Sequence, residues 1–289
     1  MDDNVMTRRL AGGDGTSSSV EPATARNRRA GRVPGRRTAP VVGKLVTLVV
    51  VCVVWHLFAI TGGSAVGLPT PWRLVETAAG MVVTGDYWAA VGSTLTSAAI
   101  GFALAVAVGV PIGLVNGSFH VLERSTRFLI DFGRTLPGVA ILPVVLLQFG
   151  TSRTMVVVLV VFSAVWPMLV QATYATQQLS AQLRSVAKAF RLTRLSRVRD
   201  IYLPSALPFL MTGLRISGTI SLLITISSEF LGGADGIGQR LYYALTVNDN
   251  DRMFGYVFTA GMLGVVLNWL LVTAQRKVLW WHPSERGKR

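Results

Sequence analysis

Long apolar runs recur along this 289-residue chain, and they limit its fold more than any other feature. A helix needs about 20 residues to cross the hydrocarbon core of a membrane. The runs that suit such helices cover about residues 45–60, 89–117, 129–149, 154–174, 207–231 and 254–275. Hydrophobic residues make up 51% of the chain and charged residues only 15%, a composition too apolar for an ordinary soluble domain. The sequence therefore predicts an all-α, polytopic membrane protein with six transmembrane helices.

The first run also resembles the core of a secretory signal peptide. About 40 residues precede Leu45, however, and no clear small-x-small cleavage site follows the run between Thr61 and Ala65. We therefore expect a retained membrane helix.

The placement of the basic residues predicts how the chain lies in the membrane. A net charge of +14 would also suit a nucleic-acid-binding protein. Here 22 of the 28 Lys and Arg fall before the first run, after the last run and in alternate loops, whereas the opposite loops hold four. Positive charge collects in this way on the cytoplasmic side of membranes. We expect a multi-pass protein of the bacterial inner membrane, in contact with lipid, with both termini cytoplasmic and no nucleic-acid partner.

Composition divides the chain into three parts. Residues 1–40 are rich in Gly, Ser, Thr, Pro and Arg, and so few large apolar side chains cannot offset the entropy cost of ordering them. We expect a disordered basic cytoplasmic tail there, a membrane domain at 41–280 and a second basic cytoplasmic tail at 281–289.

The chain offers no recognisable catalytic, cofactor-binding or metal-binding set of its own. Its one cysteine, Cys52, lies inside an apolar run, so an intrachain disulfide or a thiolate metal site cannot form. The three histidines, His56, His120 and His282, form no HExxH motif, and no GxxxxGK[ST] loop occurs. We expect no enzyme, and any ATP that drives this protein must be bound by another subunit.

The long loop at about residues 177–202 has a helical period. Its first half places Leu183, Val186, Ala187 and Phe190 at the i, i+3, i+4 and i+7 positions of one helix face. Its second half places Leu195, Val198 and Tyr202 on one face. Basic residues surround both faces, which predicts a helix, turn, helix pair that presents apolar side chains to a groove in a soluble partner. A basic amphipathic segment resting on anionic lipid is the alternative.

This loop resembles that of the permeases of binding-protein-dependent ABC importers, whose pattern is E-A-A-x3-G-x9-I-x-L-P. Ala187, Ile201, Leu203 and Pro204 match the pattern. Ser185 stands in place of its glutamate, Val186 of its first alanine and Arg191 of its glycine. Four segments resemble the nitrate, sulfonate and taurine branch of the family: 68–71, 203–208, 213–215 and 228–238.

The resemblance implies an ATP-driven importer of a small polar or anionic solute. In this family the loop is the coupling helix, which docks on cytoplasmic ATP-binding subunits. A second permease copy, identical or related, and an extracytoplasmic solute-binding protein complete the expected partners. The residues expected to carry coupling are Leu183, Ser185, Val186, Ala187, Phe190, Arg191, Ile201, Leu203 and Pro204.

Hydroxyl side chains recur every three or four residues in the fifth predicted span. They are Ser217, Ser221, Thr225 and Ser228, which we call the hydroxyl stripe. The stripe is our candidate for the lining of the translocation route, because small hydroxyls can bind a polar solute without trapping it. Close helix packing through small residues is the alternative explanation.

Several other residues carry structural expectations. Glu229 is expected to accept hydrogen bonds from the loop backbone that follows it, and Asp131 and Arg134 are expected to form an ion pair. The prolines expected to kink spans are Pro111, Pro137 and Pro143. A short amphipathic helix is expected within residues 68–82, on the membrane surface.

The sequence lacks the features of two other classes of membrane protein. A secondary transporter driven by an ion gradient would normally show two related halves and ion ligands at mid-membrane, and neither is found. A membrane-embedded enzyme would need a catalytic set, and no recognisable one occurs.

Overall fold

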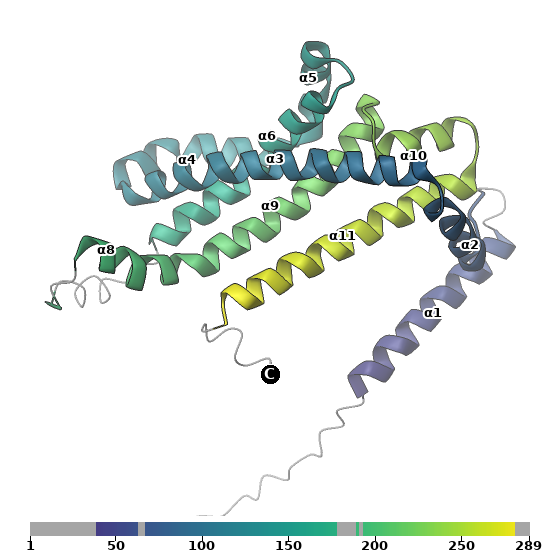
Figure 1. Cartoon of the computed structure of the whole chain (residues 1–289), viewed down its shortest axis with the longest axis horizontal. Coiled ribbons are helices and arrows are strands. Elements are labelled where there is room, and N and C mark those ends of the chain that lie inside the picture. Colours follow the sequence, from purple (N-terminus) through teal and green to yellow (C-terminus); the bar gives the residue numbers. More distant parts are fainter. Residues whose placement is uncertain (1–38, 63–66, 178–188, 191–192, 281–289) are drawn as a thin grey trace, which may run out of the picture. The chain divides into compact units, whose positions relative to one another are not determined.

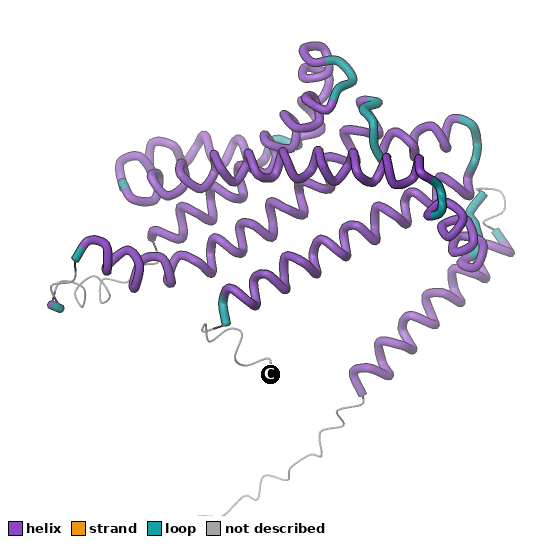
Figure 2. Tube along the Cα trace, viewed as in Figure 1, coloured by secondary structure: helices purple, strands orange, loops and turns teal. Residues whose placement is uncertain are grey.

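The computed structural model describes residues 39–62, 67–177, 189–190 and 193–280. Every regular element within these residues is a helix, as Figure 2 shows, so the predicted all-α class is confirmed. The first span is α1 (Ala39–Thr61). The boundary between two compact units of the chain, Met1–Leu48 and Val49–Arg289, falls within this helix. Most of the predicted tail at 1–40 and all of that at 281–289 lie outside the described residues.

Long helices confirm the second, fourth, fifth and sixth predicted spans. They are α3 (Gly85–Ser118), α6 (Arg153–Gln177), α9 (Leu203–Gly232) and α11 (Asn250–Val278). Each is long and apolar enough to cross a membrane. α3 lies beside α6, α9 packs on both, and α11 packs on α9 (Figure 1).

Glycines let α3 and α6 approach closely, and their contacts show that the two helices are parallel. Gly101 of α3 faces Val160, and Gly113 faces Leu169 and Ala172 further along α6. A Cβ at Gly113 would overlap the carbonyl oxygen of Leu169. Small residues at such contacts replace the hydrophobic driving force that lipid cannot supply between helices.

The third predicted span, 129–149, is broken and not merely kinked. The chain forms α4 (His120–Thr135), a 3₁₀ turn η2 (Gly138–Ile141) and α5 (Leu142–Phe149), with a bend of 83°. Pro137 causes the break, because a proline disfavours helical geometry in the residue before it and has no N–H to donate.

The backbone at Leu136 and at Pro137 is accordingly extended, with ψ of 120° and 121°. The predicted kink at Pro137 is therefore confirmed, in a stronger form. Pro143 does not kink a span, since it lies in the first turn of α5, where a proline costs no hydrogen bond. Pro111 lies inside α3, which continues past it.

The broken segment must return the chain from one end of the helix pair to the other. α3 and α6 run in the same direction, so Ser118 and Arg153 lie at opposite ends. α4, η2 and α5 together connect those ends, which makes them a sixth crossing despite the bend.

Two shorter helices lie where α3, α6 and α11 begin. α2 (Pro71–Val82) is the predicted amphipathic helix, and Arg73 within it pairs with Asp251 at 2.9 Å. Its Met81 is buried against Gly255, so α2 packs on α11 and is not merely a surface helix. α10 (Ile237–Thr246) contacts α9, α11 and α3.

Candidate functional site

The described part of the predicted coupling loop leads directly into α9. α8 (Arg194–Arg197) and the π-helical turn η3 (Val198–Tyr202) form one continuous helical path with α9. The second half of the loop is therefore an extension of the fifth span and not a separate helix. α9 itself begins at Leu203, four residues before the predicted span of 207–231.

Apolar side chains along this approach are exposed. The exposed fractions are 74% at Phe190, 78% at Leu195 and 52% at Val198, and Leu203 is also exposed. Ile201 and Pro204 are half-buried. Exposed large apolar side chains beside a basic segment are typical of a surface that another protein or lipid covers. The remaining predicted coupling residues, Leu183, Ser185, Val186, Ala187 and Arg191, lie outside the described residues.

The hydroxyl stripe exists as predicted, and it is buried. Ser217, Ser221, Thr225 and Ser228 are each at most 1% exposed. Ser217 donates to the carbonyl of Ala164 on α6 at 2.9 Å, so the stripe faces that helix. Ser221 and Thr225 donate to carbonyls one turn earlier on their own helix, each at 2.8 Å. These contacts favour the packing explanation for the stripe.

Glu229 accepts hydrogen bonds at the start of α10. Its Oε2 accepts from the hydroxyl of Thr94 on α3 at 2.8 Å and from the N–H of Gly238 at 3.1 Å. The Thr94 oxygen in turn accepts from the N–H of Ile237 at 2.9 Å. The expected bond from the following loop backbone is therefore confirmed. A Cβ at Gly236 would overlap the carboxylate, so a glycine is needed for this close approach.

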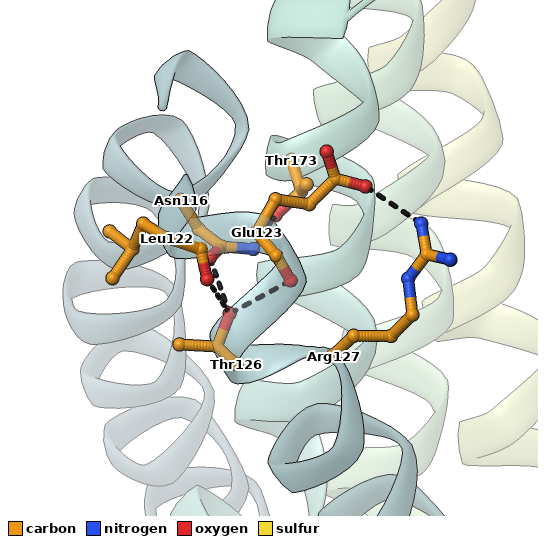
Figure 3. Close-up of polar contacts among 6 residues, drawn as sticks. All are labelled: Asn116, Leu122, Glu123, Thr126, Arg127 and Thr173. Atoms are coloured by element: carbon orange, nitrogen blue, oxygen red, sulfur yellow. Dashed lines mark hydrogen bonds and ion pairs between the residues drawn. The ribbon is translucent and has the colours of Figure 1, made fainter. Parts of the chain in front are cut away.

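A second polar cluster joins α3, α4 and α6 at the end predicted to face the cytoplasm (Figure 3). Thr126 donates to the amide oxygen of Asn116 at 2.6 Å, and the amide nitrogen of Asn116 donates to Thr173 at 3.3 Å. Glu123 pairs with Arg127 at 3.0 Å. The sequence reasoning missed Asn116 and Thr173, although a polar residue inside an apolar run would have indicated them.

A cavity of about 500 Å³ lies beside the break between α4 and η2. Arg134 and the break form one wall, Ser163, Trp166 and Gln171 of α6 a second, and Ile220 and Leu223 of α9 a third. Arg134 also forms the predicted ion pair with Asp131, at 3.4 Å. The sequence indicated Arg134 and Pro137 as structural residues only, and nothing in it showed that α6 and α9 meet them.

A family model described as "Binding-protein-dependent transport system inner membrane component" matches residues 105–279. The match begins inside α3 and ends after α11, and it includes the coupling approach, the hydroxyl stripe and the cavity.

Curated relatives match most of this chain. SsuC of Bacillus subtilis, named for aliphatic sulfonates transport, is 25% identical and covers 88% of this chain and 92% of its own. The nitrate import permease NrtB of Synechocystis is 26% identical, and the match covers 85% of this chain and 91% of NrtB. The bicarbonate transport system permease CmpB of Synechococcus elongatus is 27% identical, and the match covers 78% of this chain and 85% of CmpB.

A solved structure shares the fold. A chain of the MetNI methionine ABC transporter, in an inward-facing conformation, superposes with a TM-score of 0.55 at 20% identity. The superposition covers 73% of this chain and 96% of that chain.

Proposed function

Because this chain belongs to the family of binding-protein-dependent transport system inner membrane components, we propose that it is the permease for a small oxyanion. It is a transport subunit of an ATP-driven importer and not an enzyme, and ATP is hydrolysed on a separate subunit. Family membership sets aside the secondary-transporter alternative. The proposed cargo rests on one observation: three relatives are named for three anions, which are sulfonate, nitrate and bicarbonate.

The segment around 180–202 transmits the ATPase cycle to the membrane domain. Its exposed apolar side chains, Phe190, Leu195 and Val198, suit a groove on a soluble ATPase. Because this segment continues into α9, a movement of the docked segment acts directly on a helix that contacts α3, α6 and α11. Differential docking in two ATPase states is the free-energy difference that such a switch requires.

Further subunits complete the transporter. A second permease copy, identical or related, faces this one, and an extracytoplasmic binding protein delivers the anion. The chain lies in the bacterial inner membrane with both termini in the cytoplasm, as the distribution of basic residues predicts.

Uptake by reconstituted proteoliposomes tests the cargo. The full complex should import nitrate, methanesulfonate or bicarbonate when ATP is supplied on the side of the membrane that carries the ATPase subunits. It should not import methionine. Uptake of methionine, or of none of the three anions, would contradict the proposed cargo.

Charge substitutions test the coupling surface. Phe190→Asp and Leu195→Asp each place an unpaired carboxylate in the expected contact, which is costly to bury. Co-purification of the ATPase should fall by at least about tenfold, the effect of losing one strong interface residue. Val121→Asp is the matched control, because Val121 is 80% exposed at the start of α4, outside the loop. Normal ATPase binding by both loop variants would remove this surface from the proposal.

A further inference from the structure

We propose that the cavity beside the α4 break is where the transported anion rests, with Arg134 as its recognising residue. This inference depends on the proposed function, because it assumes an anionic cargo. The cavity volume of about 500 Å³ lies within the usual range for small-molecule sites.

The helices around this cavity are interrupted. Non-helical backbone at membrane depth is stable only where protein covers it or where it lines a cavity that admits water. The break at Leu136 and Pro137 is such a segment, and the cavity lies against it. Across the cavity, Pro167 lies inside α6 and leaves the carbonyl of Ser163 without its helical N–H donor. Interrupted membrane helices of this kind form solute sites in transporters.

The charge on the cavity wall suits an anion. Arg134 is the one charged residue among the described residues that line the cavity, and no carboxylate joins it there. Its ion pair with Asp131 is long, at 3.4 Å, and both side chains are more than half exposed, so the pair is weak. The neighbouring cavity around Asn116 differs, because two carboxylates line it and balance the charge of its two arginines: Glu123, Asp131, Arg127 and Arg134.

Trp166 supplies a rigid part of the cavity wall. Its ring packs against Gly133 of α4, where a Cβ would overlap it, and meets Phe162 edge to face at 6.2 Å. The indole nitrogen is buried and has no hydrogen-bond partner among the described residues, and an acceptor in the cavity does not reach it. The ring therefore shapes the cavity and does not donate a hydrogen bond to the anion.

The remaining wall favours release of the anion. Ile220 and Leu223 of α9 line the cavity, whereas the hydroxyl stripe of the same helix is buried elsewhere against α6. This apolar wall adds no further polar contacts that would hold the anion.

Charged thiol reagents can test the site without knowledge of the partner subunits. Gln171→Cys, in a Cys52→Ser background, places one thiol on the cavity wall. The reaction rate of this thiol is measured in nanodiscs with two reagents, anionic sulfonatoethyl methanethiosulfonate and cationic trimethylammonioethyl methanethiosulfonate. Each rate is divided by the rate of the same reagent with a free thiol. The rate ratio is the normalised anionic rate over the normalised cationic rate. The anionic reagent should be favoured, and Arg134→Gln should lower the rate ratio by about tenfold, because the loss of one unit charge acts with opposite sign on the two reagents.

Matched variants make the result specific. Arg134→Lys should keep the preference, and so should Arg127→Gln, which removes an exposed arginine from the same helix. Sodium nitrate should slow the anionic reagent more than sodium gluconate of equal ionic strength.

The inference is overturned if Arg134→Gln leaves the ratio unchanged, if Arg127→Gln lowers it equally, or if nitrate gives no protection. A different measurement tests the proposed function: the unmodified complex would take up no anion if that function were wrong. Normal anion uptake by Arg134→Gln with an unchanged ratio would reject this site alone.

Discussion

Glu229 is a carboxylate with no exposed surface in a helix that crosses the membrane, and its neighbours explain how the fold tolerates it. Charged groups inside membranes are rare and are normally paired. Here the partners are the Thr94 hydroxyl and the N–H of Gly238 in the first turn of α10, where N–H groups have no partner within the helix. Thr94 also accepts from the N–H of Ile237. Glu229 and Thr94 therefore hold α10 against α3 and α9.

Replacing Thr94 by valine tests this network. Val has the shape of Thr without the hydroxyl, so Thr94→Val leaves the N–H of Ile237 without its acceptor and removes one donor to Glu229. We expect the free energy of unfolding in detergent to fall by about 1–3 kcal/mol. Thr96→Val is the control, because the exposed Thr96 hydroxyl bonds only within α3, to Gly92. Equal losses in the two variants would contradict the role of Thr94.

The hydroxyl stripe can be tested in the same way. Ser221→Leu forces extra volume into the buried contact with α6, and we expect it to lower the free energy of unfolding by about 1–3 kcal/mol. Thr219→Leu, on the exposed side of α9, should have little effect. If Ser221→Leu blocks uptake while stability and ATPase assembly stay normal, the stripe is the translocation route after all.

Among the elements, the α3–α6 pair and the broken α4–α5 segment show two opposite uses of special residues. Glycines of α3 allow an uninterrupted helix to approach α6 closely. Pro137 instead ends a helix inside a span and leaves a cavity next to it. The first arrangement favours rigidity, and the second provides space that a solute can occupy.

Alanine substitutions at two glycines of α3 should have opposite effects. Gly113→Ala places a Cβ against the backbone of α6 and should lower the free energy of unfolding by about 1–3 kcal/mol. Nothing lies within 4 Å of a Cβ at Gly92, so Gly92→Ala should be neutral or stabilising by about 0.5–1 kcal/mol, the helix preference of alanine over glycine. Thermal unfolding of the purified variants measures both, and a loss at Gly92 equal to that at Gly113 would contradict the close contact.

For the whole molecule, the decisive feature is that the bent segment crosses the membrane and does not turn back within it. Parallel packing of α3 and α6 requires a crossing. Hydrogen bonds join three segments at the end of the molecule where α6 begins. Arg153 donates to Ser93, and Ser93 donates to the carbonyl of Asp235.

Single-cysteine labelling in intact cells checks this topology in a Cys52→Ser background. An impermeant thiol reagent should reach Thr151→Cys and Asp235→Cys, and it should not reach Arg124→Cys or Arg199→Cys. All four positions are exposed. If Thr151→Cys and Arg124→Cys behave alike, the bent segment is a re-entrant loop and the chain has five spans.

The sequence by itself determined the helical class, the location of the spans, the break at Pro137 and the face of α9 that carries the hydroxyl stripe. These are local properties, because hydropathy, helical period and the geometry of proline act over one or two turns. Only the tertiary structure decided which helices meet: that Thr94 supports Glu229, that Gly113 faces Leu169, and that the stripe faces α6. It also decided that Arg134, Trp166 and Gln171, from two segments, share a cavity. An apolar helix in lipid shows no single outward face in its sequence, since lipid and protein interior are equally apolar, so its partners are selected by shape and by polar pairing that appear only after packing.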